Sequence, residues 1–217
     1  PLCTDGTCGI TCNAGFADGH AFTMRKSKIP TIIGLFTLIL GLAAGVFLVR
    51  NQNIFRLGAI AELAPKDVRI SNITDTSLTI SWITDKETSG FVKWGESVTS
   101  LDKTELDELK DQSFTHLLTL RRLTSQTTYF FKINSGGEDF DNNGIAWQVT
   151  SGATLEIPSK TNLVSGSILT STGQPAKNAL LYLTVGSGNL LSTITSQNGS
   201  WVIPFSQARA QDLSSYI

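Results

Sequence analysis

The chain has 217 residues, of which 41% are hydrophobic and 16% are charged, and its formal net charge is −1. This composition suits one or two small globular domains, and it lacks the basic excess with which proteins bind nucleic acid. All three cysteines precede Asn13. We therefore expect the rest of the chain to be held together by apolar cores, without disulfide bonds.

Residues 1–23 contain these cysteines, which are Cys3, Cys8 and Cys12. Their number is odd and their spacing is not that of a Cys-x-x-Cys pair, so zinc binding, with His20 as a further ligand, is the less favoured interpretation. Met24 is the only methionine, and it opens the basic sequence Met-Arg-Lys-Ser-Lys. A signal anchor starts in this way, so we hypothesise that residues 1–23 are absent from the natural mature protein.

Residues 24–50 are predicted to be a signal anchor with one transmembrane helix. The 21 residues from Ile29 to Val49 carry no charge. At 1.5 Å per residue, a helix of this length covers roughly 30 Å, the thickness of the hydrocarbon core of a bilayer. We expect the membrane to be a partner of the protein through residues 29–49.

The flanking charges predict the orientation of this helix. Three cations, Arg25, Lys26 and Lys28, lie close before it, and those after it are more widely spread. The positive-inside bias places the N-terminus in the cytoplasm and residues 50–217 outside, as in a single-pass protein of the cell membrane. A cleaved signal peptide is the alternative, but its apolar region is usually only about 7–15 residues long.

A polar stalk is predicted over residues 51–64, and alternating apolar and polar residues begin after Pro65. In Ser77–Trp82, for example, Leu78, Ile80 and Trp82 alternate with serine and threonine, which is typical of a half-buried strand. Strands separated by turn residues and without helical periodicity indicate an all-β sandwich over 65–152. The expected strands are 68–70, 77–82, 90–95, 116–120, 128–133 and 145–150.

Two parts of this region depart from the simple pattern. Residues 101–110, Leu-Asp-Lys-Thr-Glu-Leu-Asp-Glu-Leu-Lys, are predicted to form one helical turn or a loop. His116 stands beside Leu117 and Leu118, and we expect it on the sheet surface without a catalytic role.

The region 65–152 resembles a fibronectin type III domain. The resemblance lies in Ser77–Trp82 and in the segment 123–133, Leu-Thr-Ser-Gln-Thr-Thr-Tyr-Phe-Phe-Lys-Ile. It implies that Trp82 packs centrally between two sheets, and that Tyr129 makes a corner contact back to the backbone near Leu123. The proline that this family usually has between that leucine and tyrosine is absent.

The segment Ser89–Gly95 is similar to a strand of the sandwich domain that precedes the catalytic domain of purple acid phosphatases. The catalytic domain of those enzymes needs clustered Asp, His and Asn ligands for two metals. This chain has two histidines, His20 and His116, on opposite sides of the apolar segment. We expect no enzyme, cofactor or metal centre within these residues.

Residues 153–162 are predicted to be a linker and 163–217 a second β domain. Its sequence resembles a carboxypeptidase-regulatory-like (transthyretin-like) sandwich, a fold that usually has more strands, so we expect the domain to be incomplete at Ile217. The pair Asn198-Gly199 lies between apolar runs and predicts a hairpin in which both turn residues have positive φ. The fold class is thus mainly β, with two immunoglobulin-like or fibronectin-like modules after one helix.

The loop containing Asp139, Asp141 and Asn143 matches the first half of a calcium loop. Thr150 occupies the place where the final glutamate would be. A polar hairpin loop is the favoured interpretation, because Asp, Asn and Gly suit tight turns.

A platform of exposed tryptophans can bind carbohydrate, and Trp94, Trp147 and Trp201 are the candidates. Because they lie on alternating strands, we expect them in the core.

Two functions fit all these observations. The first is a non-enzymatic surface protein whose sandwiches act as spacer, adhesion or binding modules toward other surface proteins or carbohydrate. The alternative is the membrane-proximal part of a surface hydrolase, with its catalytic domain beyond residue 217.

Overall fold

The computed structural model describes residues 31–50, 60–109, 111–156 and 158–217, and within the first range it describes the side chains of 32–47. The cysteine segment 1–23, the cations before the apolar segment and residues 51–59 of the predicted stalk lie outside the described residues. The interpretations given for them remain predictions. The chain divides into two units, Pro1–Asn51 and Gln52–Ile217.

The first unit contains one helix, α1 (Thr31–Arg50). Its sequence is rich in leucine and isoleucine and contains no proline, which favours a helix. The large apolar side chains described in it are exposed, from Ile32 to Phe47. Among the residues that the structure describes, no helix is both long and apolar enough to cross a membrane.

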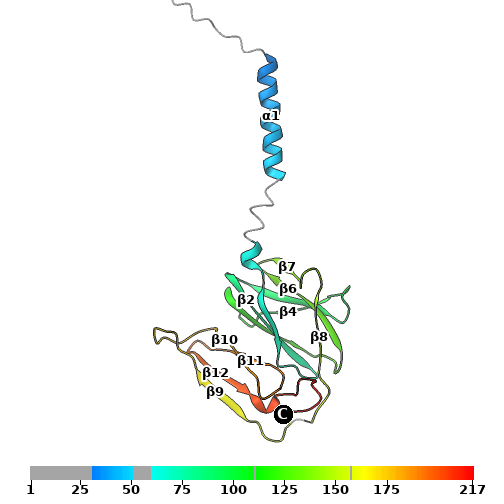
Figure 1. Ribbon diagram of the computed structural model, residues 1–217, viewed down its shortest axis with the longest axis vertical. Helices are drawn as coiled ribbons and strands as arrows, with labels where there is room; N and C mark the ends of the chain where they lie inside the picture. The colour runs from blue at the N-terminus through cyan, green and yellow to red at the C-terminus, as the bar shows by residue number, and fades with distance from the viewer. Residues whose placement is uncertain (1–30, 51–59, 110, 157) are drawn as a thin grey trace, which may run out of the picture. The chain divides into compact units, whose positions relative to one another are not determined.

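In the second unit, a helical turn at residues 60–63, within the predicted stalk, precedes a β-sandwich (Figure 1). One antiparallel sheet has the order β1-β2-β5, from β1 (Lys66–Ser71), β2 (Ser77–Thr88) and β5 (Ser113–Arg121). In the other sheet, β3 pairs with β4 and β6, and β6 pairs with both β7 and β8. The bounds of these strands are β3 (Gly90–Gly95), β4 (Lys103–Leu106), β6 (Thr128–Ser135), β7 (Glu138–Phe140) and β8 (Trp147–Thr150).

The core of the sandwich lies between the two sheets, because alternate residues of facing strands point inward. Leu78, Ile80 and Trp82 of β2 meet Val92 of β3 and Phe131 of β6 there. These residues have no solvent exposure.

The opposite face of β2 is buried as well. Thr79 and Ser81 are 2% and 0% exposed, although the alternation predicted a half-buried strand. They are covered because residues after 163 contact this face of the sheet, for example through Tyr182, whose hydroxyl lies 2.9 Å from the Ser81 hydroxyl. Small hydroxyl side chains suit such a face, because they can be buried and still form hydrogen bonds.

Residues 101–109 form a short strand with non-strand residues on both sides, and the predicted helical turn is wrong. Lys103–Leu106 is the edge strand β4, and its residues pair with Phe91 to Trp94 of β3. Backbone hydrogen bonding continues after β4, since the Asp107 N–H donates to the Gly90 carbonyl of β3 and the Glu108 N–H to the Leu117 carbonyl of β5. Pairing with an existing strand here outweighs the weak helical spacing of the leucines.

The C-terminal part contains two further two-stranded sheets. β9 (Leu163–Ser167) pairs with β12 (Ser200–Pro204), and β10 (Leu180–Leu183) pairs with β11 (Leu191–Ile194). A short 3-10 helix, η1 (Phe205–Gln207), follows. The buried apolar residues of this part are Leu191, Ile203 and Ala208, with four half-buried side chains around them.

The predicted hairpin at Asn198-Gly199 is wrong in two respects. The strands on its two sides, β11 and β12, belong to different sheets. Only Gly199 has a positive φ, 76°, and the turn is closed by the Gly199 N–H donating to the Ser196 carbonyl. The Asn-Gly pair therefore turns the chain from one sheet to the next, with glycine alone in the left-handed region.

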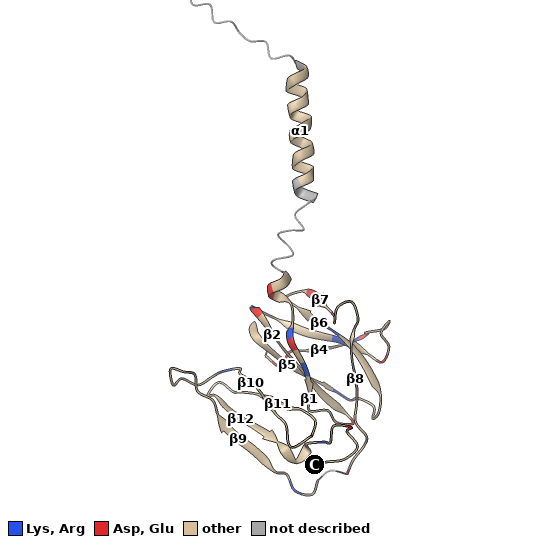
Figure 2. Cartoon of the chain, in the orientation of Figure 1, with Lys and Arg blue, Asp and Glu red and all other residues tan. Residues whose placement is uncertain are grey.

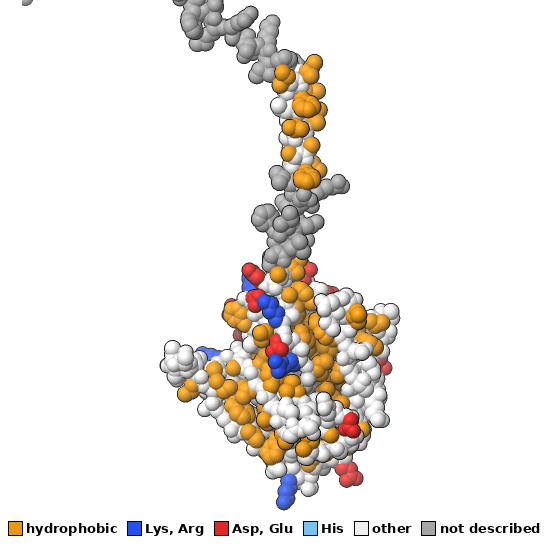
Figure 3. Space-filling view, in the orientation of Figure 1, with side chains coloured by type: hydrophobic (Ala, Val, Ile, Leu, Met, Phe, Trp, Pro, Cys, Tyr) orange, Lys and Arg blue, Asp and Glu red, His pale blue; other side chains and the backbone are white. Residues whose placement is uncertain are grey.

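The surface of the C-terminal part carries little charge. Lys177, Arg209 and Asp212 are the charged residues of 163–217 (Figure 2). Apolar side chains are exposed along β9 and β12, among them Leu163, Val164 and Val202 (Figure 3). Hydrogen bonds to the first sandwich thus have a large share in holding this part in place.

Candidate functional sites

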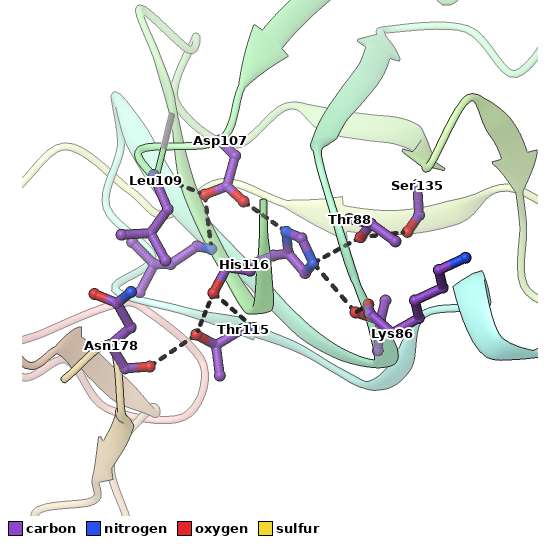
Figure 4. A network of polar contacts seen from close by, with 11 residues as sticks. Lys86, Thr88, Asp107, Leu109, Thr115, His116, Ser135 and Asn178 are labelled. Atoms are coloured by element: carbon purple, nitrogen blue, oxygen red, sulfur yellow. Dashed lines mark hydrogen bonds and ion pairs between the residues drawn. The ribbon is translucent and has the colours of Figure 1, made fainter. Parts of the chain in front are cut away.

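A buried histidine lies at the centre of the first sandwich (Figure 4). His116 is 0% exposed, so its predicted place on the sheet surface is wrong. In β5 it shares a face with Leu118 and Leu120, and its cross-strand partner is Trp82. The two rings stack with centroids 4.8 Å apart. The period-two alternation with the two leucines was the sequence signal for this burial.

Both nitrogens of the His116 ring have polar partners. Nδ1 lies 2.6 Å from Asp107 Oδ2, and Nε2 lies 3.1 Å from Thr88 Oγ1 and 3.4 Å from Thr84 Oγ1. The Thr88 hydroxyl lies 3.1 Å from that of Ser135. Asp107 is fixed in turn, because its Oδ1 accepts the backbone N–H groups of Leu109 and Leu117 (Figure 4).

The order carboxylate, imidazole, hydroxyl is that of an acyl-transfer triad. Thr88 and Asp107 are buried together with His116, however, so the reacting atoms would be shielded from solvent and substrate. The network instead links β2, β5 and β6 with the segment after β4. It also depends on Gly90, where a Cβ atom would lie 2.6 Å from Trp82 Cζ2 and 3.2 Å from His116 Nδ1.

The three residues predicted for the core, Trp82, Leu123 and Tyr129, are all buried. The Tyr129 hydroxyl accepts the backbone N–H of Thr124 at 2.8 Å. The Tyr129 ring meets the buried ring of Trp94 edge to face at 5.5 Å. The tyrosine thus contacts the backbone directly after Leu123, which fixes the turn before β6.

Of the calcium-loop candidates, Asp139 lies in β7, and Asp141 and Asn143 lie in the segment between β7 and β8. Asp139 accepts hydrogen bonds from Lys93 at 2.6 Å and Asn134 at 2.6 Å, while Asp141 accepts them from Lys132 and the Gly144 N–H. Asn143 and Gly144 both have positive φ and form the two central residues of a tight turn. Both carboxylates are therefore already paired, and the calcium prediction remains untested.

These pairings lower the pKa values of both carboxyl groups. The Lys93 hydrogen bond, followed by that of Asn134, lowers the pKa of Asp139. The Gly144 N–H, followed by Lys132, lowers the pKa of Asp141. Within the described ranges, this loop included, no three His, Cys, Asp or Glu side chains gather in a way that could hold a metal ion.

A polar junction joins the sheet β1-β2-β5 to the C-terminal strands, and Asn72 is its centre. The Asn72 side chain donates to the Ser192 carbonyl and accepts the Ser192 N–H, both at 2.9 Å. Its own N–H donates to the Leu190 carbonyl at 2.8 Å. Asn72 has a φ of 51°, a left-handed conformation that asparagine adopts more readily than most residues. One residue after β1 thereby bonds the edge of β11.

Further contacts extend the junction on both sides of Asn72. Arg69 stacks over the ring of Tyr182 at 4.6 Å, and the Thr115 hydroxyl donates to the Asn178 carbonyl at 2.7 Å. Arg209 is 2% exposed, and its guanidinium donates to the Ala153 carbonyl at 2.5 Å and to Asp75 at 3.1 Å. Sequence reasoning missed this junction, because each partner is an ordinary surface residue type.

Comparison with protein families gives one match. The matching model describes the N-terminal domain of purple acid phosphatases, and it matches residues 65–152. This is the non-catalytic domain of those enzymes. No curated protein matches the chain.

Solved structures with similarity share little sequence with this chain. The sensor domain of the anti-sigma factor RsgI4 from Pseudobacteroides cellulosolvens is 17% identical, with 41% of this chain and 98% of that chain covered and a TM-score of 0.30. The purple acid phosphatase PPD1 of yellow lupin (Lupinus luteus) seeds is 15% identical over 47% of this chain and 21% of that chain, with a TM-score of 0.31. The FN1–FN3 domains of chicken CNTN1 are 14% identical, with 64% of this chain and 54% of that chain covered and a TM-score of 0.27. At such scores these likenesses carry no argument about function.

Proposed function

We propose that residues 60–217 act as a rigid, non-catalytic spacer or binding module, tethered to the outer face of the cell membrane through residues 29–49. The polar junction carries this proposal. Modules joined by a linker alone move relative to each other, whereas Asn72, Tyr182 and Arg209 form hydrogen bonds between the first β part and the second. A rigid pair of modules holds a binding surface at a fixed distance.

The membrane tether is supported by the character of α1. No described helix meets the length and hydropathy of a membrane span, but the described side chains of α1 other than Thr37 are apolar and exposed, as for Ile32 at 80%. A helix that is apolar all round needs either a protein core or lipid around it. The basic residues before it in the sequence favour a cytoplasmic N-terminus and an external module.

The rigidity of the junction can be tested with Asn72→Ala in the full chain in detergent micelles. The variant loses the paired hydrogen bonds to Ser192, so we expect faster hydrogen exchange at the amides of 190–194, measured by mass spectrometry. Asn162→Ala is the matched control, because Asn162 is exposed. Equal exchange of β11 in both variants would contradict the rigid-junction proposal.

The tether can be tested by placing arginine at Leu38 and Leu42. Each charge at the centre of a membrane helix costs about 2.5–3.5 kcal/mol in insertion, so the double variant should move from the membrane fraction to the carbonate-soluble fraction. Leu38→Ile with Leu42→Ile is the control and should stay in the membrane. Recovery of the unaltered protein in the soluble fraction would rule out the tether.

A second function is favoured by the match of residues 65–152 to the purple acid phosphatase domain. Here the sandwiches are accessory domains of a surface hydrolase, such as a purple-acid-phosphatase-like metallophosphoesterase. The native protein, purified from its source, would then contain bound metal and hydrolyse a phosphate monoester. A native protein without bound metal and without phosphatase activity would contradict this second function and favour the spacer or adhesion function.

A further inference from the structure

A cavity at one edge of the first sandwich is lined mainly by charged side chains. It has a volume of about 410 Å³ and is lined by Trp94, Lys103, Glu105, Arg121 and Arg122. These residues come from β3, from the edge strand β4 and from the end of β5. The cavity therefore lies where the edges of the two sheets approach each other, and its volume is within the range of small-ligand sites.

The lining contains three cations and one carboxylate, although the whole chain has a net charge of −1. The neighbouring carboxylates neutralise these cations only weakly. Lys103 lies 3.9 Å from Glu96, and Arg121 lies 3.9 Å from Glu108, distances at the outer limit of an ion pair between exposed groups. Arg122 has no ion pair with any residue that the structure describes. Like charges held together in this way favour an anion.

Packing holds Lys103 at the cavity. Its ammonium group lies 4.6 Å from the ring centroid of Trp94, its cross-strand partner. The Trp94 ring is itself buried and packed against Tyr129. The cation–π contact therefore places the lysine charge over a fixed aromatic wall.

The backbone at Arg122 is in an unusual conformation. Its φ is 60°, in the left-handed region that is costly for a side chain such as arginine. The next residue, Leu123, is buried and its N–H donates to the Thr76 carbonyl at 2.9 Å. These contacts of Leu123 hold the backbone of Arg122 in its left-handed conformation. Asparagine would suit this backbone better, and strained residues of this kind cluster at functional sites.

We propose that this cavity is a binding site for an oxyanion group, a phosphate or a carboxylate, on a small ligand. Arg122 supplies planar guanidinium donors for the oxygens, and Lys103 supplies a point charge beside them. Arg121, which also lines a cavity on the other face of its sheet, adds to the positive charge. The proposal is independent of the tether and of the rigid junction.

The test is calorimetry of the full chain in nonionic detergent at low ionic strength, with inorganic phosphate and glucuronate as separate probes. We expect at least one probe to bind, and Arg122→Asn to weaken its binding about tenfold through loss of a charge-assisted hydrogen bond. This variant should fold at least as well as the natural chain, because asparagine tolerates the left-handed backbone. Lys177→Gln, an exposed charge outside the cavity, makes the same change in net charge and should leave binding unaltered.

Binding of phosphate alone identifies a phosphate-bearing ligand, binding of glucuronate alone identifies an acidic sugar, and binding of both identifies a general oxyanion site. Each of these outcomes supports the proposal when Arg122→Asn reduces the affinity and Lys177→Gln does not. Absence of binding by both probes overturns it. Equal losses in the two variants also overturn it, because they would indicate unspecific attraction.

Discussion

At the scale of single residues, the buried pair of Asp107 and His116 sets the strongest local requirement. The two side chains are 2.6 Å apart and have almost no exposure. Burial of polar groups is tolerated only when each has a partner, and here each does. A change at one member therefore affects the other.

We expect Asp107→Ala to lower the free energy of unfolding by about 3 kcal/mol, because it leaves His116 buried without its partner. The double variant Asp107→Leu with His116→Leu should cost clearly less, since no polar group is then left unpaired. Denaturant unfolding of the full chain in detergent, followed by tryptophan fluorescence, measures both. A double variant less stable than Asp107→Ala would contradict this account.

Residue-level reasoning from the sequence worked where the alternation of side chains was complete. Trp82 lies inside the sandwich on a strand whose sequence alternates from Ser77 to Trp82. The buried place of Tyr129 was implied by the resemblance to fibronectin type III domains, because Phe130 interrupts the alternation of its strand. The prediction that His116 lies on the sheet surface is wrong because it rests on the polar character of histidine. The alternation of the strand places His116 on the same buried face as Leu118 and Leu120. Asp107, its partner, is nine residues away, and only the fold brings it there.

At the scale of elements, the hairpin around β7 depends on two lysine–aspartate pairs. The Lys93 hydrogen bond lowers the pKa of Asp139 below its ordinary value of 3.8, and the Gly144 N–H, followed by Lys132, lowers that of Asp141. A carboxyl group with a lowered pKa in the folded state stabilises that state above its ordinary pKa. The stabilisation is lost as the pH falls through the lowered value.

We therefore expect the hairpin amides to exchange faster as the pH falls below about 4, after correction for intrinsic exchange rates. The effect should be modest, because both pairs are partly exposed and are screened by salt. Asp139→Asn should reduce this pH dependence. An Asp139→Asn protein with an unchanged pH profile would show that the pair does not stabilise the hairpin.

The same pairing leads to an expectation for calcium. A calcium ion would have to replace both lysines, and the loop offers no glutamate at Thr150 to complete the coordination. Calorimetry with millimolar calcium should therefore give no heat from the natural chain. Heat that disappears in Asp141→Asn would instead establish a calcium site.

Strand positions were more predictable than the pairing of strands. The alternation indicated most strands of the first sandwich, but β4 was missed because four residues give too short a pattern. The Asn-Gly signal correctly indicated a turn at residues 196–199. It could not indicate which sheets the flanking strands join, because this depends on contacts distant in sequence.

At the scale of the whole molecule, the folding of the second β part depends on the first more than the folding of the first depends on the second. The first has a continuous core of eleven buried apolar residues, whereas the second has three. The face of the first part that meets the second carries Ser71, Thr79 and Ser81, whose hydroxyl groups can bond water when uncovered. The second part would lose its bonds to Asn72 and to Asp75.

This inequality predicts different outcomes for the two parts when they are separated. A chain ending at residue 152 should fold, with a lower melting temperature than the full chain, because its core stays intact. Residues 153–217 alone should be unfolded, because a core of three buried side chains does not offset the conformational entropy of about 65 residues. Circular dichroism and the dispersion of amide proton signals distinguish folded from unfolded chains. A cooperatively folded 153–217 segment would show that the junction holds a self-sufficient domain, and the role of Asn72 and Arg209 would then be orientation alone.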